Sequence, residues 1–123
     1  MKRVAVSYSI KTSTADVVEA LKRCPWSEEV DCIVECNKSE GLKSWADQMG
    51  LGFMNFINMW NSLEGVIENL DERKKKELSE NTDYFLAIGD DSNHNNKIVI
   101  DAANRKKKPL AIFRSNRLSF QNC

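Results

Sequence analysis

Residues 82–113, TDYFLAIGDDSNHNNKIVIDAANRKKKPLAIF, constrain the fold of this chain more than any other stretch. Residues 84–88 form a short apolar run typical of a strand that is buried on both faces, and a turn-rich loop follows at 89–96. Apolar residues then recur at helical spacing from 98 to 103, and a second apolar run at 109–113 opens with a proline, which is tolerated at a strand start. A strand, loop, helix and strand of these lengths predict a βαβ unit with parallel strands and a right-handed crossover.

The same alternation of apolar strands and amphipathic helices precedes this unit. Strands are predicted at residues 3–8, 30–35 and 51–57. A helix is predicted after each strand: one capped by Thr12 or Ser13, one with Gly50 as its C-cap, and one from near Leu63 to near Glu80. The pattern predicts an α/β protein with a three-layer, Rossmann-like, doubly wound fold, in which helices cover both faces of a mainly parallel five-stranded sheet. Residues 1–114 are expected to form this single domain, and residues 115–123 a C-terminal tail.

Charge and cysteine content limit the partners of the chain. It carries 18 basic and 18 acidic residues, so neither nucleic acid nor a membrane is an expected partner. Without a signal peptide or an apolar stretch of about 20 residues, a cytoplasmic location is expected, in the host cytoplasm if the protein is viral. Cys32 and Cys36 fall in one predicted strand about 13 Å apart, which is too far for a disulfide, and neither is spaced from His94 as in a zinc site. No metal and no cofactor are therefore expected.

The polar loops that follow the predicted strands carry the candidate site, because ligands of open parallel sheets bind beyond the carboxyl ends of the strands. These loops supply the candidate ligand-binding residues Ser7, Tyr8, Ser9, Asn37, Lys38, Ser39, Trp60, Gly89, Asp90, Asp91, Ser92 and Asn95. Asp90 and Asp91 either accept ribose hydroxyls or form the turn and cap the following helix. Tyr8 and Trp60 are candidates to stack on a purine, and Trp60 equally suits packing against the third helix.

A further pattern runs through residues 2–114. It consists of residues 40–50, EGLKSWADQMG, then Trp60, Arg73, Thr82-Asp83, and Ala102-Ala103 to Lys108-Pro109. In order and spacing these residues resemble the YspA-like branch of the SLOG superfamily, in which a WA…G signature, a tryptophan, an arginine and an acidic element follow one another. The resemblance implies a Rossmann-like domain that binds nucleotides or nucleotide-derived ligands, and it adds Arg73 to the ligand-binding candidates.

The superfamily includes phosphoribohydrolases that activate cytokinins and sensor domains of bacterial defence systems, some of which bind cyclic ADP-ribose isomers. This sequence departs from the pattern at two glycine-rich loops. Cys36-Asn37 or Glu35-Cys36 replaces the Gly-Gly pair after the second strand, and residues 89–96 replace the second loop. Glycines in such loops let backbone N–H groups approach a phosphate, whereas Asp90 and Asp91 would repel it unless a divalent cation or a ribose hydroxyl is their partner.

Two functional hypotheses follow. The first is a protein that binds or sequesters a nucleotide-derived signal without turnover, such as an ADP-ribose derivative or a cyclic ADP-ribose isomer, as a phage anti-defence protein would. The missing glycine-rich loops favour it. The alternative is a nucleoside or nucleotide N-glycosidase in which Glu40 or Glu64 acts at the anomeric carbon, although both glutamates also suit the first turn of a helix. A homo-oligomer is expected under either hypothesis, because a second subunit would cover apolar residues at 53–60 and Phe120.

Overall fold

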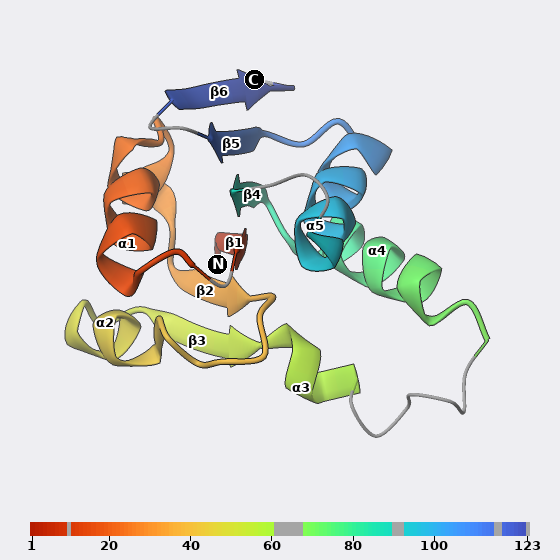
Figure 1. Ribbon diagram of the computed structural model, residues 1–123, viewed down its shortest axis with the longest axis horizontal. Coiled ribbons are helices and arrows are strands. Elements are labelled where there is room, and N and C mark those ends of the chain that lie inside the picture. The colour runs from red at the N-terminus through yellow and green to blue at the C-terminus, as the bar shows by residue number, and fades with distance from the viewer. Residues whose placement is uncertain (10, 61–67, 90–92, 115–116, 123) are drawn as a thin grey trace.

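The computed structural model describes residues 1–9, 11–60, 68–89, 93–114 and 117–122 (Figure 1). The strands are β1 (Arg3–Tyr8), β2 (Cys32–Glu35), β3 (Gly52–Asn55), β4 (Tyr84–Ile88), β5 (Leu110–Arg114) and β6 (Arg117–Gln121). The helices are α1 (Thr14–Arg23), α2 (Lys43–Gln48), α3 (Phe56–Trp60), α4 (Leu70–Asn81) and α5 (His94–Arg105), with a short 3-10 helix at Ser27–Glu29.

The strands form one sheet in the order β3-β2-β1-β4-β5-β6. Strands β1 to β5 are parallel, and β6 pairs with β5 in the antiparallel direction. The chain adds β2 and β3 on one side of β1, and β4 and β5 on the other side, which is the doubly wound arrangement of a Rossmann-like fold. The predicted α/β class with a mainly parallel sheet is therefore confirmed.

The sheet has six strands rather than the predicted five. The sixth strand, β6, lies in the segment 115–123 that the sequence pattern assigns to a C-terminal tail, and it pairs with β5 from Leu110 opposite Gln121 to Arg114 opposite Arg117. Most β6 residues are exposed at the sheet edge, so the strand lacks the apolar run that marks a buried strand. Leu118 packs against the core, but one apolar contact is a weak sequence signal.

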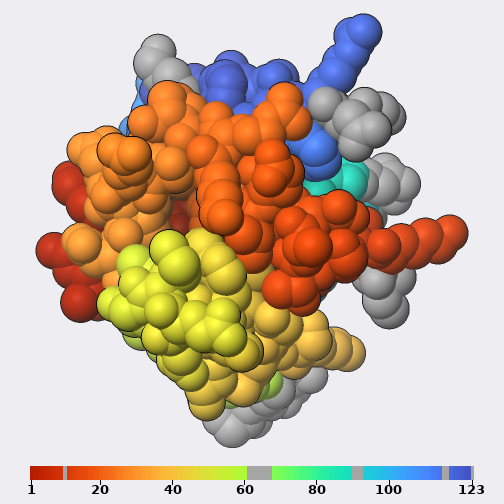
Figure 2. Space-filling model, turned by 90° about the vertical axis from the view of Figure 1, so that its left-hand side faces the viewer, coloured from red at the N-terminus to blue at the C-terminus, as the bar shows by residue number. Residues whose placement is uncertain are grey.

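Helices cover both faces of the sheet, so the protein has three layers. Helices α1 and α2 lie on one face and α4 and α5 on the other (Figure 1), and Figure 2 shows the face that α1 and α2 cover. Because side chains alternate along a strand, Val4 and Val6 of β1 belong to the core under α1 and α2, whereas Ala5 belongs to the core under α4 and α5. All three side chains are fully buried, as expected for a central strand that is covered on both faces.

The segment after β3 differs from the sequence expectation. The apolar pattern predicts a strand at 51–57 and then a loop, but β3 ends at Asn55 and α3 begins at Phe56. The Asn55 side-chain oxygen accepts a hydrogen bond from the Asn58 N–H at 3.0 Å, which satisfies a free donor in the first turn of the helix. Of the helix predicted from near Leu63 to near Glu80, residues 63–67 lie outside the described residues, residues 68–69 form a turn, and α4 begins at Leu70.

The structure bears on two expectations from the sequence, one about the cysteines and one about membrane-spanning helices. Cys32 and Cys36 are buried thiols that form no disulfide with each other, as their spacing predicts, and Cys24 is buried as well. Within the described ranges, the structure contains no helix with the length and apolar character that crossing a membrane requires.

Candidate functional site

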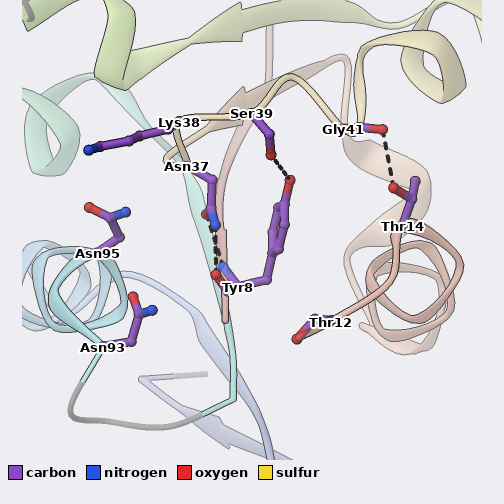
Figure 3. A pocket seen from close by; sticks show the side chains of 9 residues that line it. All are labelled: Tyr8, Thr12, Thr14, Asn37, Lys38, Ser39, Gly41, Asn93 and Asn95. Atoms are coloured by element: carbon purple, nitrogen blue, oxygen red, sulfur yellow. Dashed lines mark hydrogen bonds between the residues drawn. The ribbon is translucent and has the colours of Figure 1, made fainter. Parts of the chain in front are cut away.

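The two halves of the sheet diverge between β1 and β4, and such a switch point is where open α/β sheets bind ligands, beyond the carboxyl ends of the strands. A cavity of about 390 Å³ lies at this position (Figure 3). Its lining residues are Tyr8, Thr12, Thr14, Asn37, Lys38, Ser39, Gly41, Asn93 and Asn95. They come from the ends of β1 and β2 and from the starts of α1, α2 and α5, so the fold gathers distant parts of the sequence into one polar cavity.

Asn37 fixes the loop after β2 against the end of β1. Its side-chain oxygen accepts a hydrogen bond from the Tyr8 N–H at 3.1 Å, and its side-chain nitrogen donates to the Tyr8 carbonyl at 2.6 Å. The amide thereby continues the ladder of hydrogen bonds between the two strands by one residue. Asn55, at the end of β3, donates in turn to the Asn37 carbonyl at 3.1 Å. The cavity wall that Asn37, Lys38 and Ser39 form is therefore held by side-chain amides at the ends of two neighbouring strands.

A buried carboxylate lies behind this wall. Glu35, the last residue of β2, has no exposed surface. Its Oε2 accepts hydrogen bonds from the Tyr8 hydroxyl at 2.8 Å and from the Leu42 N–H at 3.2 Å, whereas its Oε1 is buried without a hydrogen-bond partner among the described residues. The Tyr8 hydroxyl also lies 3.2 Å from Ser39 Oγ. Glu35 thus joins β1, β2 and the start of α2 directly beneath the cavity.

Burial governs the ionisation of this pair. It raises the pKa of the Glu35 carboxyl, and the hydrogen bonds from Tyr8 and from the Leu42 N–H partly oppose that rise. Burial likewise raises the pKa of the Tyr8 hydroxyl to about 12; the hydrogen bond with Ser39 opposes this rise and Glu35 adds to it. Tyr8 is therefore protonated at neutral pH and has a hydrogen to donate.

The start of α5 forms another side of the cavity. Asn93 caps this helix, because its side chain accepts from the Asn96 N–H at 3.1 Å. The fully buried Asn96 donates to the Ile88 carbonyl of β4 at 3.0 Å and accepts from the Ser7 hydroxyl of β1. One amide therefore attaches the N-terminus of α5 to both central strands, and this fixes where Asn93 and Asn95 lie.

The structure brings five of the predicted ligand-binding residues into the cavity, namely Tyr8, Asn37, Lys38, Ser39 and Asn95. Ser9 and Gly89 line a neighbouring hollow of about 250 Å³, which shares Thr12 with the cavity. Ser7 is close by, but its hydroxyl is buried against Asn96.

Two other predicted residues lie elsewhere. Trp60 is in α3, where its ring packs against Phe56 with 5.8 Å between the ring centroids, and Arg73 is exposed on α4. Neither contributes to the lining of the cavity as the described residues form it. For Trp60, this favours packing over stacking on a ligand.

Of the two candidate catalytic glutamates, the structure describes only Glu40. Glu40 is exposed, its Oε1 lies 3.5 Å from the Asn58 side-chain nitrogen, and it is not part of the described lining. Glu64, together with the ligand-binding candidates Asp90, Asp91 and Ser92, lies outside the described residues. Among the described His, Cys, Asp and Glu side chains, no group of three or more could hold a metal ion.

Sequence reasoning missed Glu35 and the lining residues Thr12, Thr14, Gly41 and Asn93. A signal for Glu35 is present, since a carboxylate ends the otherwise apolar strand CIVE directly before the polar loop. Thr14 and Asn93 stand at helix starts, where polar residues are common as caps, so their sequence context indicates local structure rather than a shared cavity.

The fold and the cavity together define an α/β protein with a polar candidate site at the switch point of a Rossmann-like sheet. No protein-family model, curated protein or solved structure matches the chain. Membership of the SLOG superfamily therefore remains a prediction.

Proposed function

We propose that the protein binds a nucleotide-derived small molecule, such as an ADP-ribose derivative, in the switch-point cavity and does not turn it over. The observation that carries this proposal is the cavity of about 390 Å³ at the carboxyl ends of β1 and β2, whose lining residues carry hydroxyl, amide and ammonium groups. Small-molecule sites have volumes of about 300–1,000 Å³, so the cavity has room for a compact ligand or for one nucleotide unit of a larger ligand.

The chemistry of the lining supports this class of ligand. Hydroxyl groups come from Tyr8, Thr12, Thr14 and Ser39, amides from Asn37, Asn93 and Asn95, and one ammonium from Lys38. Hydroxyl and amide groups are hydrogen-bonding partners for a sugar or a base. The starts of α1 and α5 also face the cavity, and the partial positive charge of a helix N-terminus favours a phosphate.

The same lining supports binding rather than hydrolysis. Cleavage of an N-glycosidic bond needs a base or nucleophile at the anomeric carbon. The described lining contains no carboxylate, and Glu35 is buried behind Tyr8 with Oε2 committed to two hydrogen bonds. Binding without turnover is the property that a signal-sequestering protein requires.

The experiment that tests the proposal is ligand capture and release. The purified protein is incubated with adenine nucleotides, ADP-ribose and cyclic ADP-ribose isomers, the complex is isolated, and the heat-released compounds are identified by mass. The expected result is one intact compound in near-stoichiometric amount. Release of free base with a ribosyl product would overturn binding without turnover, and capture of no compound would overturn the ligand class.

A matched pair of variants locates the binding site in the same experiment. Lys38→Ala removes the ammonium of the lining, whereas Lys43→Ala removes an exposed ammonium at the start of α2 that is not part of the lining. Capture is expected to fall in Lys38→Ala and to be retained in Lys43→Ala. Equal capture by both variants would place the ligand outside this cavity.

A further inference from the structure

We infer that Glu35 sets the hydrogen-bonding polarity of one cavity wall, so that this wall accepts hydrogen bonds from sugar hydroxyls while the opposite wall takes the phosphate of the same ligand. The inference rests on the proposed function and adds the orientation of the ligand. It makes Glu35 a positioning residue that acts through Tyr8, without contact with the ligand.

The polarity follows from the single hydrogen of the Tyr8 hydroxyl. Tyr8 donates this hydrogen to Glu35 Oε2 at 2.8 Å. In the contact of 3.2 Å between Tyr8 and Ser39, the Tyr8 oxygen must therefore accept, and Ser39 must donate. Both hydrogens are then used, so any further hydrogen bond at either oxygen is one that the oxygen accepts.

The direction of the bond between Tyr8 and Glu35 follows from the ionised form of Glu35. Oε2 already accepts from Tyr8 and from the Leu42 N–H, whereas Oε1 has no partner among the described residues. The Glu35 carboxylate has no hydrogen to donate, so its Oε2 can only accept the Tyr8 hydrogen.

Two neighbouring residues extend the accepting wall. Thr14 Oγ1 donates to the Gly41 carbonyl at 3.4 Å, so the Thr14 oxygen also has only lone pairs left for a ligand. Gly41 has no side chain to cover the wall, and a Cβ there would lie 3.0 Å from the Tyr8 hydroxyl. The Tyr8, Ser39 and Thr14 oxygens thus form a patch that accepts hydrogen bonds from O–H and N–H donors of a ligand.

The opposite wall has the reverse polarity. Figure 3 shows Lys38, Asn93 and Asn95 on one side of Tyr8, and Gly41 and Thr14 on the other. The side with Lys38, Asn93 and Asn95 combines the Lys38 ammonium with the N-terminus of the 12-residue helix α5. Both of these groups favour an anion. A nucleotide that satisfies both walls places its sugar diol at Tyr8 and Ser39 and its phosphate towards α5.

The test uses AMP and 2′,3′-dideoxy-AMP as probes, with calorimetry as the readout. AMP is expected to bind about 10-fold more tightly than the dideoxy compound, the effect of losing one or two hydrogen bonds. Tyr8→Phe and Ser39→Ala are each expected to weaken AMP and to leave dideoxy-AMP unchanged. Equal binding of the two probes by the unmodified protein would overturn the inference and leave the proposed function standing. No binding of AMP would also overturn it, whereas the proposed function is judged by the capture panel.

A second pair of variants tests the role of Glu35 itself. Glu35→Gln keeps an acceptor oxygen for Tyr8 and is expected to retain the preference for AMP, whereas Glu35→Leu removes the acceptor, frees the Tyr8 hydrogen and is expected to lose it. A merely structural role would reduce the binding of both probes by the same factor. If Glu35→Leu does not fold, Tyr8→Phe and Glu35→Gln are used for the test. Loss of the preference for AMP over dideoxy-AMP in Glu35→Gln would contradict the positioning role of Glu35.

Discussion

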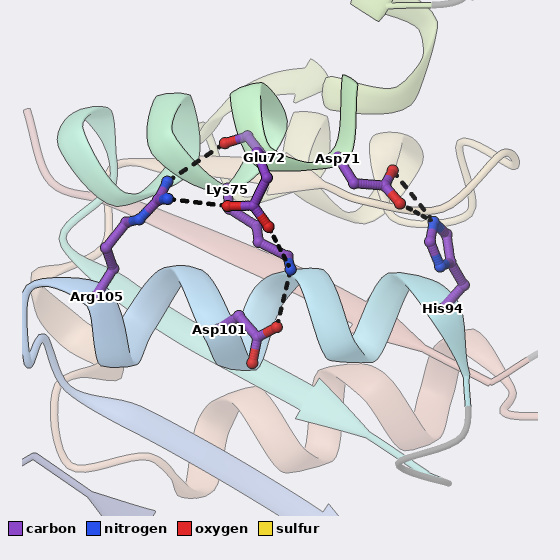
Figure 4. Close-up of polar contacts among 6 residues, drawn as sticks. All are labelled: Asp71, Glu72, Lys75, His94, Asp101 and Arg105. Carbon is purple, nitrogen blue, oxygen red and sulfur yellow. Dashed lines mark hydrogen bonds and ion pairs between the residues drawn. The ribbon is translucent and has the colours of Figure 1, made fainter. Parts of the chain in front are cut away.

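The Lys75 ammonium of α4 lies 3.0 Å from the Asp101 carboxylate of α5, and it joins the two helices that cover one face of the sheet (Figure 4). The same ammonium lies 3.3 Å from Glu72, which also pairs with Arg105 at 3.0 Å. The hydrogen bond with Asp101 is the main cause that raises the pKa of Lys75. Ion pairs of this exposed kind add modestly to stability and are screened by salt.

Lys75→Ala is accordingly expected to lower the free energy of unfolding by about 0.2–1 kcal/mol, and by less at high salt. Urea denaturation at low and high sodium chloride concentration measures the change. Lys76→Ala, at an exposed position in the same helix, is the control and is expected to have little effect. An equal loss in both variants would show that helix propensity, rather than the ion pairs, is responsible.

Stability is expected to depend on pH through Glu35. Burial raises its pKa in the folded protein above the ordinary value of 4.5, so the folded state holds the proton more tightly than the unfolded state. The carboxyl therefore contributes stability that is fully present below about pH 4.5 and is lost as pH rises through the raised pKa. Glu35→Gln, which does not ionise, should become more stable relative to the unmodified protein over this window. Urea denaturation from about pH 4 to about pH 8 checks this, and a pH-independent difference would contradict it.

Two glycine substitutions are expected to separate binding from stability. In Gly41→Ala the new Cβ would lie 3.0 Å from the Tyr8 hydroxyl and 3.3 Å from Thr14 Oγ1, so the accepting wall must shift, and AMP affinity should fall by about 10-fold. Gly50 has a φ of +70° and open space around it, so Gly50→Ala should cost about 1–2 kcal/mol of stability without an effect on affinity. Calorimetry and thermal unfolding measure the two quantities. If Gly50→Ala lowered AMP affinity and Gly41→Ala did not, the wall beside Gly41 would not be part of the binding site.

Self-association is a further prediction, which follows from residues at the surface. Met49, Met59 and Phe120 are exposed large apolar side chains, and Phe120 lies on the edge strand β6. Sedimentation velocity at micromolar concentration is expected to give a mass above that of one chain. A mass equal to one chain would refute the prediction, and Phe120→Ser would show whether the β6 edge takes part.

The strands that could be predicted are those with an uninterrupted run of apolar residues. Residues of β1, β4 and β5 are buried on both faces, and such strands are identifiable as uninterrupted apolar runs. The edge strand β6 has no such run and was missed. Phe56 and Ile57 prolong the apolar run of β3, so the sequence gives no sign that the Asn55 side chain ends the strand and starts a helix.

The candidate site could be predicted in part for a related reason. Tyr8, Asn37 and Ser39 follow strands directly, and topology alone places them at the carboxyl edge. Glu35 could not be assigned, because only the structure shows that Tyr8 and the Leu42 N–H satisfy one of its oxygens. Trp60 was a stacking candidate by its position after a strand, yet the turn into α3 directs its ring onto Phe56.

The attachment of α5 by Asn96 also bears on how the chain folds. Asn96 joins Ser7 and Ile88, and its bond to Ser7 spans 89 positions. The central strand β1 is synthesised well before its neighbour β4 and the Asn96 amide that fastens both strands. Contacts of such long sequence separation require a large loop to close before they give any stabilisation, so folding should be slower than for a helical bundle of equal length. The switch-point cavity, which depends on the same junction, can form only after β4 and α5 are available.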